Sequence, residues 1–143
     1  MELWKPFADE FGAEGLTLFS TEHWTVLVRK AQPTLGALVL VANRNFISGA
    51  ELSADELREF PEVVGRLEGA LSAAFQFDKI NYLLLMMKDR HYHFHVLPRY
   101  ESSRHFAGVE WKDTGWPGQA AMAVPEANEE TLAALRDHLA KRL

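Results

Sequence analysis

Residues 91–97 read His-Tyr-His-Phe-His-Val-Leu, and this alternation constrains the fold more than any other feature of the sequence. Three of the six histidines fall in this segment, each separated from the next by an aromatic residue. Successive side chains of a β-strand point to opposite faces, so His91, His93 and His95 share one face and the apolar residues between them share the other. The sequence therefore predicts a strand that is apolar on one side and lined with imidazole rings on the other.

Other periodic patterns predict further elements on both sides of this strand. Trp4, Phe7 and Phe11 are at helical spacing, which indicates a short helix over residues 3–11 that ends at Gly12. Apolar and β-branched runs bounded by turn residues predict five strands in all. These strands are expected over residues 16–19, 24–29, 37–42, 79–87 and 91–100.

The start of a long helix is predicted by a capping box. Ser53 and Glu56 are spaced so that each side chain accepts a hydrogen bond from the other residue's backbone N–H. Apolar residues then recur every three or four positions to about residue 75, namely Leu57, Phe60, Val64, Leu67 and Leu71. Pro61 lies within this pattern, so we expect a kink or a restart of the helix there. Residues 108–118 are expected to form an ordered loop and residues 129–143 a terminal helix.

These elements favour an α+β fold with an antiparallel sheet, because the strands gather around one long helix without regular βαβ alternation. A chain of 143 residues is of ordinary size for one domain with its own hydrophobic core. We therefore expect a single domain over residues 1–143. Its motif-bearing core would cover about residues 16–100, followed by a C-terminal loop and helix over residues 101–143.

The composition excludes several functions. The chain has no cysteine, which excludes thiolate nucleophiles, cysteine-bound zinc and iron–sulfur clusters. Its net charge of −5 has the wrong sign for a generic binder of nucleic-acid polymers. The longest apolar run, residues 37–42, is far shorter than the roughly 20 residues that cross a bilayer. We expect a soluble, cytoplasmic protein that binds neither nucleic-acid polymers nor membranes.

Metal binding is one chemistry that a row of histidines serves, because neutral imidazole is a common ligand. His91 and His95 would lie about 13 Å apart along a strand, since the rise is about 3.3 Å per residue. That separation is too large for both to reach one zinc at about 2.0–2.1 Å. A metal site would need two histidines of the row together with a carboxylate or a third histidine, such as His23 or His105.

Nucleophilic catalysis on a phosphoryl group is the second chemistry. A neutral imidazole nitrogen can attack phosphorus, and neighbouring imidazoles can donate hydrogen bonds to phosphate oxygens. An extended row of imidazoles also matches an extended phosphate chain. A third interpretation is that the row is only a polar surface whose hydrogen bonds are satisfied. It does not explain why three histidines alternate with apolar residues.

Residues 91–97, followed by Pro98 and Arg99, resemble the histidine-triad (HIT) motif, His-φ-His-φ-His-φ-φ with φ apolar, of diadenosine polyphosphate hydrolase-like proteins. The resemblance extends over roughly residues 16–100 and includes the segments 32–46 and 78–87, the latter similar to a bacterial branch of the family. It implies a five-stranded antiparallel sheet with one long helix packed on it and short terminal helices. It also implies a homodimer.

The resemblance further implies catalytic roles for the row. His93 would attack the α-phosphate of a nucleotide, His95 would bind phosphate, and His91 would support the array. The activity implied is hydrolysis or transfer of a nucleotidyl group through a covalent nucleotidyl-histidine. Candidate substrates are a dinucleoside polyphosphate, a nucleotide phosphoramidate or an adenylylated compound. No cofactor is needed, although a divalent cation bound with the substrate phosphates is compatible with this chemistry.

Asn81, Asn45 and Arg99 are the candidate substrate-binding residues. Three features depart from the family pattern: Asn45 stands where a further histidine is common, residues 87–90 lack the usual Gln, Ser or Thr, and Arg29-Lys30 replaces an acidic ribose-binding residue. The attack on phosphate is therefore better supported than recognition of the ribose. A nucleotide-binding module with little turnover and a histidine-ligated metal enzyme remain as alternatives.

Overall fold

The computed structural model describes residues 1–143 and contains a five-stranded antiparallel sheet with the order β1-β2-β3-β5-β4. Its strands are β1 (Thr17–Ser20), β2 (Trp24–Val28), β3 (Leu38–Ala42), β4 (Lys79–Leu83) and β5 (His93–Arg99), and β6 (Arg104–Phe106) and β7 (Val109–Trp111) form a separate hairpin. The helices are α1 (Lys5–Phe11), α2 (Ala13–Leu16), α3 (Ala54–Phe75) and α4 (Glu129–Ala140), with a short 3-10 turn η1 (Gly49–Glu51). The predicted α+β architecture is confirmed.

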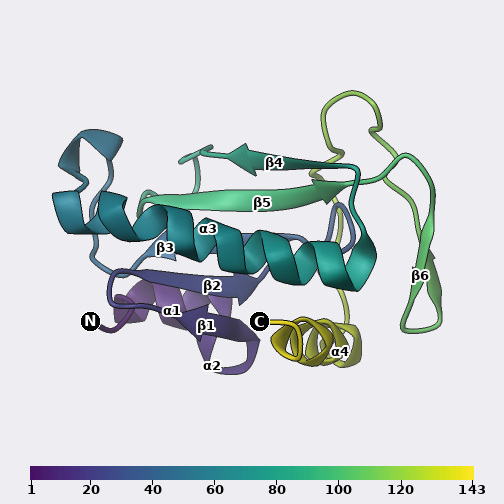
Figure 1. The fold of residues 1–143 in the computed structure, drawn as a ribbon, viewed down its shortest axis with the longest axis horizontal. Helices are drawn as coiled ribbons and strands as arrows, with labels where there is room; N and C mark the ends of the chain where they lie inside the picture. Colours follow the sequence, from purple (N-terminus) through teal and green to yellow (C-terminus); the bar gives the residue numbers. More distant parts are fainter.

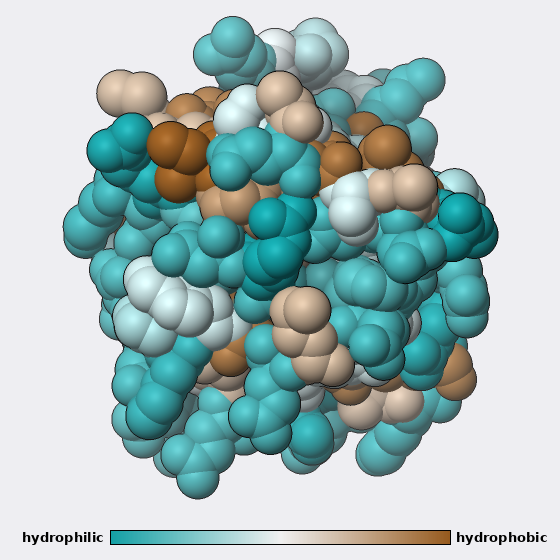
Figure 2. All heavy atoms as spheres, turned by 90° about the vertical axis from the view of Figure 1, so that its left-hand side faces the viewer, coloured by the Kyte–Doolittle hydropathy of each residue, from teal (hydrophilic) through white to brown (hydrophobic).

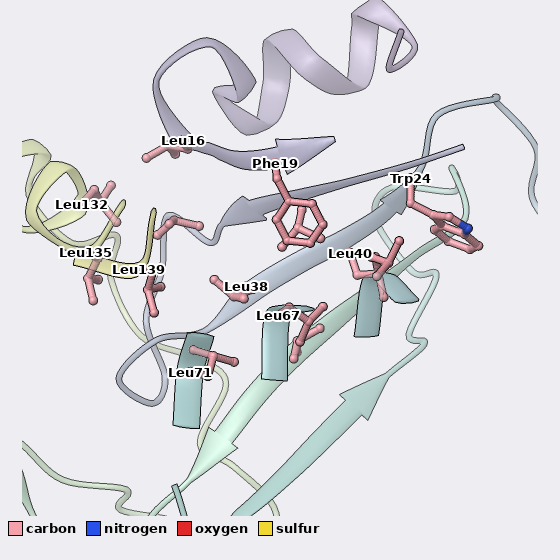
Figure 3. Packing of buried hydrophobic residues seen from close by; sticks show 14 of the residues in the cluster. Leu16, Phe19, Trp24, Leu38, Leu40, Leu67, Leu71, Leu132, Leu135 and Leu139 are labelled. Carbon is pink, nitrogen blue, oxygen red and sulfur yellow. The ribbon is translucent and has the colours of Figure 1, made fainter. Parts of the chain in front are cut away.

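Helices cover both faces of the sheet (Figure 1). The main core lies on the side of α3 and α4, where Leu67 and Leu71 of α3 meet Leu38 and Leu40 of β3 (Figure 3). A smaller cluster lies on the opposite face, where Phe7 of α1 packs against β2 and β3. Burial of these side chains provides the main favourable free energy for folding.

The sheet register sets the direction of each histidine. In the pairing of β3 with β5, Val41 lies opposite His93 and Val39 lies opposite His95. His93 faces α1, where its ring centre is 5.4 Å from that of Phe7. Phe94 faces the opposite side, where it contacts Phe60 of α3. The alternation of an apolar face with an imidazole face is therefore confirmed.

Several boundaries differ from the prediction. Strand β4 ends at Leu83 rather than at residue 87, because Met86 adopts a left-handed backbone conformation with φ of 52° that a strand cannot continue through. Strand β5 begins at His93 rather than at His91. The segment 108–118, expected to be a loop, contributes β7 to the hairpin.

Helix α3 begins with the predicted capping box between Ser53 and Glu56. It runs without interruption to Phe75, so the expected kink or restart at Pro61 is wrong. Leu57, whose carbonyl would normally pair with the N–H that proline lacks, is 55% exposed, and water can satisfy that carbonyl. The expectation that Leu57 belongs to the apolar face is therefore also wrong. No helix, α3 included, has the length and apolar character needed to cross a membrane.

Candidate functional site

Helix α1 covers the first half of the histidine row with aromatic rings. The ring of Phe7 lies 4.9 Å from His91, and that of Phe11 lies 5.8 Å from His93. Trp4 adds a third ring, 5.7 Å from His91. Phe7 and Phe11 are four residues apart and so stack on one helix face. This packing restricts the orientations of both imidazoles and excludes water from the side of the row facing α1.

His91 is buried and does not line the pocket that contains His93 and His95. Its Nε2 donates to the backbone oxygen of Ala42 at 2.5 Å, because a carbonyl oxygen can only accept. Its Nδ1 is buried without a hydrogen-bond partner. Burial lowers the pKa of His91 below its ordinary value, which keeps the ring neutral.

His93 is held with its second nitrogen free. Its Nδ1 donates to the backbone oxygen of His91 at 2.6 Å, so the proton of the neutral ring is on Nδ1 and the lone pair is on Nε2. Burial lowers the pKa of His93, and the positive charge of Arg29 lowers it further. An unprotonated nitrogen at the wall of a pocket is the group that a nucleophilic histidine requires.

His95 has the opposite tautomer. Its Nδ1 accepts a hydrogen bond from Nε of Arg29 at 3.1 Å, so its proton is on Nε2. Burial and the nearby charge of Arg29 lower the pKa of His95 to about 4. Its ring lies edge-on to His93 with 5.0 Å between the ring centres. The row therefore presents a lone pair on His93 next to an N–H donor on His95.

A pocket of about 360 Å³ opens over His93 and His95. Its walls come from the end of α1, from Arg29 and Lys30 after β2, from residues 85–89 after β4, and from Glu126. The three cationic side chains, Arg29, Lys30 and Lys88, are balanced by three acidic ones, Glu10, Asp89 and Glu126. The formal charges of these six side chains cancel. The cationic ones can nevertheless hold an anion against the histidines.

Glu10 and Asp89 face each other at the rim of this pocket. A hydrogen bond and repulsion from Asp89 raise the pKa of the exposed Glu10 carboxyl. The two residues lie 79 positions apart, and no spacing in the sequence connects them. Only the docking of α1 next to the segment before β5 brings them together.

Arg99 and Asn81 are not part of this pocket. Nη1 of Arg99 donates to Oδ1 of Asn81 at 2.8 Å, and Nε of Arg99 donates to Asp113 at 2.7 Å. Arg99 is six residues beyond His93 on the same strand, which is about 20 Å at 3.3 Å per residue. The structure joins Arg99, Asn81 and Asp113 in one hydrogen-bonded network, in which the side chains of Arg99 and Asp113 are buried, and keeps them apart from the histidines.

Asn45 is exposed in the loop after β3, near the His91 end of the row, and does not line the pocket. Of the six predicted site residues, only His93 and His95 meet in one cavity. The contact of Arg29 with the row could not be predicted from the sequence. The identity of Arg29 was visible as a departure from the family pattern, but its contact with His95 spans 66 positions.

Acidification is expected to destabilise the fold in the window where these histidines titrate. The pKa values of His91, His93 and His95 are all lowered by folding, so the unfolded chain binds more protons as the pH falls below about 6.5. Stability is therefore greatest above that pH and is lost progressively towards the folded pKa of about 4 for His95. Urea unfolding at pH 7.5, 6 and 5 should give falling midpoints, with a shallower decline for His95→Asn. Equal midpoints at pH 7.5 and 5 would contradict this expectation.

The side chains show no cluster of three or more His, Cys, Asp or Glu residues able to hold a metal ion. His23 forms a pair with Glu59, with 2.5 Å between Nδ1 and Oε2. His105 lies on the β6–β7 hairpin next to Glu110. Neither of these two histidines, which were considered as additional ligands, lines the pocket over the row.

The sequence matches no protein-family model and no curated protein. Among solved structures, the fold is similar to that of a histidine-triad protein from Sinorhizobium meliloti, with a TM-score of 0.73, 19% identity and coverage of 94% of each chain. It is also similar to a hypothetical histidine triad nucleotide-binding protein from Sulfolobus tokodaii, with a TM-score of 0.71, 18% identity, and coverage of 96% of this chain and 90% of that one. A zinc-bound histidine triad family protein from Mycobacterium smegmatis has a TM-score of 0.61 and 16% identity, with coverage of 95% of this chain and 93% of that one. These similarities establish the fold.

Proposed function

We propose that this chain, which has the histidine-triad fold, cleaves or transfers the nucleotidyl group of a nucleotide bound over His93 and His95. The observation that carries the proposal is the pairing of two opposite tautomers in one pocket. The free Nε2 of His93 is a nucleophile, and the N–H of His95 next to it is a donor for a phosphate oxygen. Arg29, Lys30 and Lys88 supply positive charge for the phosphates.

In the proposed reaction, the lone pair on Nε2 of His93 forms a bond to the α-phosphorus. The bond from phosphorus to the leaving atom breaks, and that atom takes the bonding pair. The proton on Nδ1 stays hydrogen-bonded to the oxygen of His91, which stabilises the positive charge that the ring gains. Water then attacks phosphorus, the N–P bond returns its pair to Nε2, and the proton lost by water passes to solvent. The product is a nucleoside monophosphate.

The candidate substrates are dinucleoside polyphosphates, nucleotide phosphoramidates and adenylylated compounds. Asn45, Asn81 and Arg99 stay predictions as substrate contacts, and their positions outside the pocket give them no support from geometry. The pocket supports an assignment of phosphate binding to His95 and a positioning role for His91, whose backbone oxygen orients His93.

The proposed covalent intermediate can be trapped directly. The protein is mixed with a dinucleoside triphosphate labelled at the α-phosphate and quenched with alkali within milliseconds, because a phosphoramidate survives base. We expect label bound to the chain at His93, identified by mass spectrometry, and released monophosphate at later times. A parallel experiment uses a labelled nucleotide phosphoramidate. If the wild type turns over substrate but no label is trapped on the chain with either compound, the covalent route is contradicted.

A nucleotide-binding module with little turnover is the second candidate. It is favoured by Asn45 in place of a family histidine and by the absence of Gln, Ser and Thr from residues 87–90. Calorimetric binding of a nucleotide without release of monophosphate would support this candidate. A stoichiometric metal in the purified protein, with activity lost on chelation, would instead support a histidine-ligated metal enzyme.

We also propose a twofold homodimer that forms at the β4 side of the sheet. Strand β4 lies at the sheet edge, paired only with β5, and is followed by Leu84, Leu85 and Met87, which are 44%, 47% and 84% exposed. Figure 2 shows hydrophobic residues gathered towards the top of the molecule, the side on which Figure 1 places β4. An exposed apolar edge of this kind favours pairing with a second copy.

Light scattering at micromolar concentration is expected to give twice the chain mass of 16.2 kDa. Leu84→Asp should shift the population towards the monomer, because a charge at an apolar interface costs free energy of association. Leu143→Asp, at the exposed end of the chain, is the matched control and should leave the dimer intact. A wild type that scatters as a 16.2 kDa particle would refute the dimer.

A further inference from the structure

Arg29 is the only charged side chain that forms a hydrogen bond with a ring of the histidine row. It follows directly after β2 and is held by a second hydrogen bond from Nη1 to the backbone oxygen of Ala31 at 2.9 Å. A guanidinium group has no lone pair to offer, so its partner nitrogen must accept. The contact at 3.1 Å therefore requires that Nδ1 of His95 carries no proton.

The other groups around His95 leave this state in place. His93 on β5 adds to the lowering of its pKa, and Asp89 before β5 opposes it with a smaller effect than burial or Arg29. The neighbours across the sheet, Val39 of β3 and Leu83 of β4, carry no charge. The remaining charged groups of the pocket are Lys30, Lys88, Glu10 and Glu126. His95 is consequently neutral at physiological pH, with its single proton on Nε2.

A neutral ring with its proton on Nε2 donates a hydrogen bond but cannot give up that proton without becoming an imidazolate. The other two histidines cannot replace it as an acid. The proton of His93 is committed to the oxygen of His91, and His91 itself is buried away from the pocket. The row therefore binds phosphate oxygens and supplies a nucleophile, but it holds no general acid for a leaving group.

We propose that Arg29 is a positioning residue that fixes His95 as a neutral donor, and that the histidine row consequently favours cleavage of bonds from phosphorus to acidic leaving groups over bonds to amines. This inference rests on the proposed function. When the P–O bond of a phosphoanhydride breaks, the leaving phosphate takes the bonding pair and departs as a stable anion that needs no proton. When a P–N bond breaks, the nitrogen must gain a proton as it leaves, and the row does not provide one.

The expected preference is large, because general acid catalysis contributes typically 10²–10⁴-fold. For two substrates with the same nucleoside, we expect the dinucleoside polyphosphate to be cleaved at least about 10²-fold faster than the phosphoramidate. In Arg29→Met, His95 loses both the donor to Nδ1 and the nearby charge. Its ring can then take a second proton on Nδ1 and deliver the one on Nε2 to a leaving nitrogen.

The state of His95 is measured first, without substrate, by nitrogen-15 NMR of the histidine rings. The wild type should show a proton on Nε2 of His95 from pH 8 to pH 6 and a midpoint below pH 5. In Arg29→Met the midpoint should rise by about one unit or more, because a lowering charge is removed. Lys30→Met is the matched control, since Lys30 lines the same pocket without contacting His95, and it should leave the midpoint unchanged.

Kinetics then test the leaving-group rule. In Arg29→Met, the ratio of polyphosphate to phosphoramidate cleavage should fall about tenfold or more, and phosphoramidate cleavage should rise as the pH falls towards the new midpoint of His95. If Arg29→Met fails to fold, the same measurements are made on Arg29→Gln, which keeps a polar side chain but removes the charge. A loss of activity equal for both substrates and flat with pH would indicate only a structural role and overturn the proposal.

Two further outcomes separate this inference from the proposed function. A proton on Nδ1 of His95 in the wild type, or equal cleavage of the two substrates, overturns the inference even if the enzyme is active. If NMR gives the expected tautomer and midpoint but no nucleotide is cleaved, the proposed function fails, the leaving-group rule fails with it, and the positioning of His95 by Arg29 is upheld.

Discussion

Replacing His93 with alanine is expected to reduce single-turnover cleavage of a dinucleoside polyphosphate by about 10⁴-fold or more. The variant lacks the one unprotonated ring nitrogen among the pocket-lining histidines that is not already occupied by a hydrogen bond, since Nδ1 of His95 accepts from Arg29. Nucleotide binding should largely survive, because Arg29, Lys30 and His95 still line the cavity. Rapid quench measures the cleavage, and calorimetry measures the binding of a non-hydrolysable nucleotide.

Two other variants calibrate this result. His95→Ala removes one hydrogen-bond donor to phosphate and should cost on the order of 10²–10³-fold. His91→Ala keeps the backbone oxygen that orients His93 and should cost no more than that. Wild-type turnover in His93→Ala would show that the nucleophile is misassigned. A wild type that binds nucleotide without cleaving it would favour the binding module.

Asp113→Ala is expected to destabilise the fold by about 3–5 kcal/mol, although Asp113 lies outside the pocket. The carboxylate of Asp113, 1% exposed, accepts hydrogen bonds from Nε of Arg99 at 2.7 Å and from Nη2 at 3.1 Å. It also accepts one from the backbone N–H of Tyr100. Its removal leaves the buried charge of Arg99 without a counterion, which costs more than the pair itself contributes. Urea unfolding measures the change.

The double variant Arg99→Met with Asp113→Ala is expected to be more stable than Asp113→Ala alone, because it removes the orphaned charge as well. Asp137→Ala, which breaks the exposed pair with Arg136, is the control and should stay within about 0.5 kcal/mol of the wild type. If Asp113→Ala is no less stable than Asp137→Ala, the buried pair does not hold the segment after β7 in place.

Much of the fold could be predicted from the sequence, because the deciding signals are local. The alternation of residues 91–97 depends only on the two-residue period of a strand, and it places the histidines on one face. The capping box of Ser53 and Glu56 and the turn at Gly12 act within a few residues of chain. Errors arose where the surroundings of a residue decided the outcome. The helix continues through Pro61, where the carbonyl that loses its partner belongs to the exposed Leu57, and at Met86 the backbone leaves the sheet to form a pocket wall.

The sequence by itself determined that three imidazoles share one face of a strand, since that depends on backbone geometry. Which of them presents a free lone pair to the pocket was decided only by the tertiary structure. Helix α1 buries His91, a carbonyl oxygen directs the lone pair of His93 to the pocket, and Arg29 sets the tautomer of His95 across 66 positions of chain. Arg99, which directly follows the histidine motif in sequence, is instead paired with Asn81 of β4, about 20 Å along β5 from His93. Hydrogen-bond partners and burial set the charge and tautomer of an imidazole, and both come from residues far away in the chain.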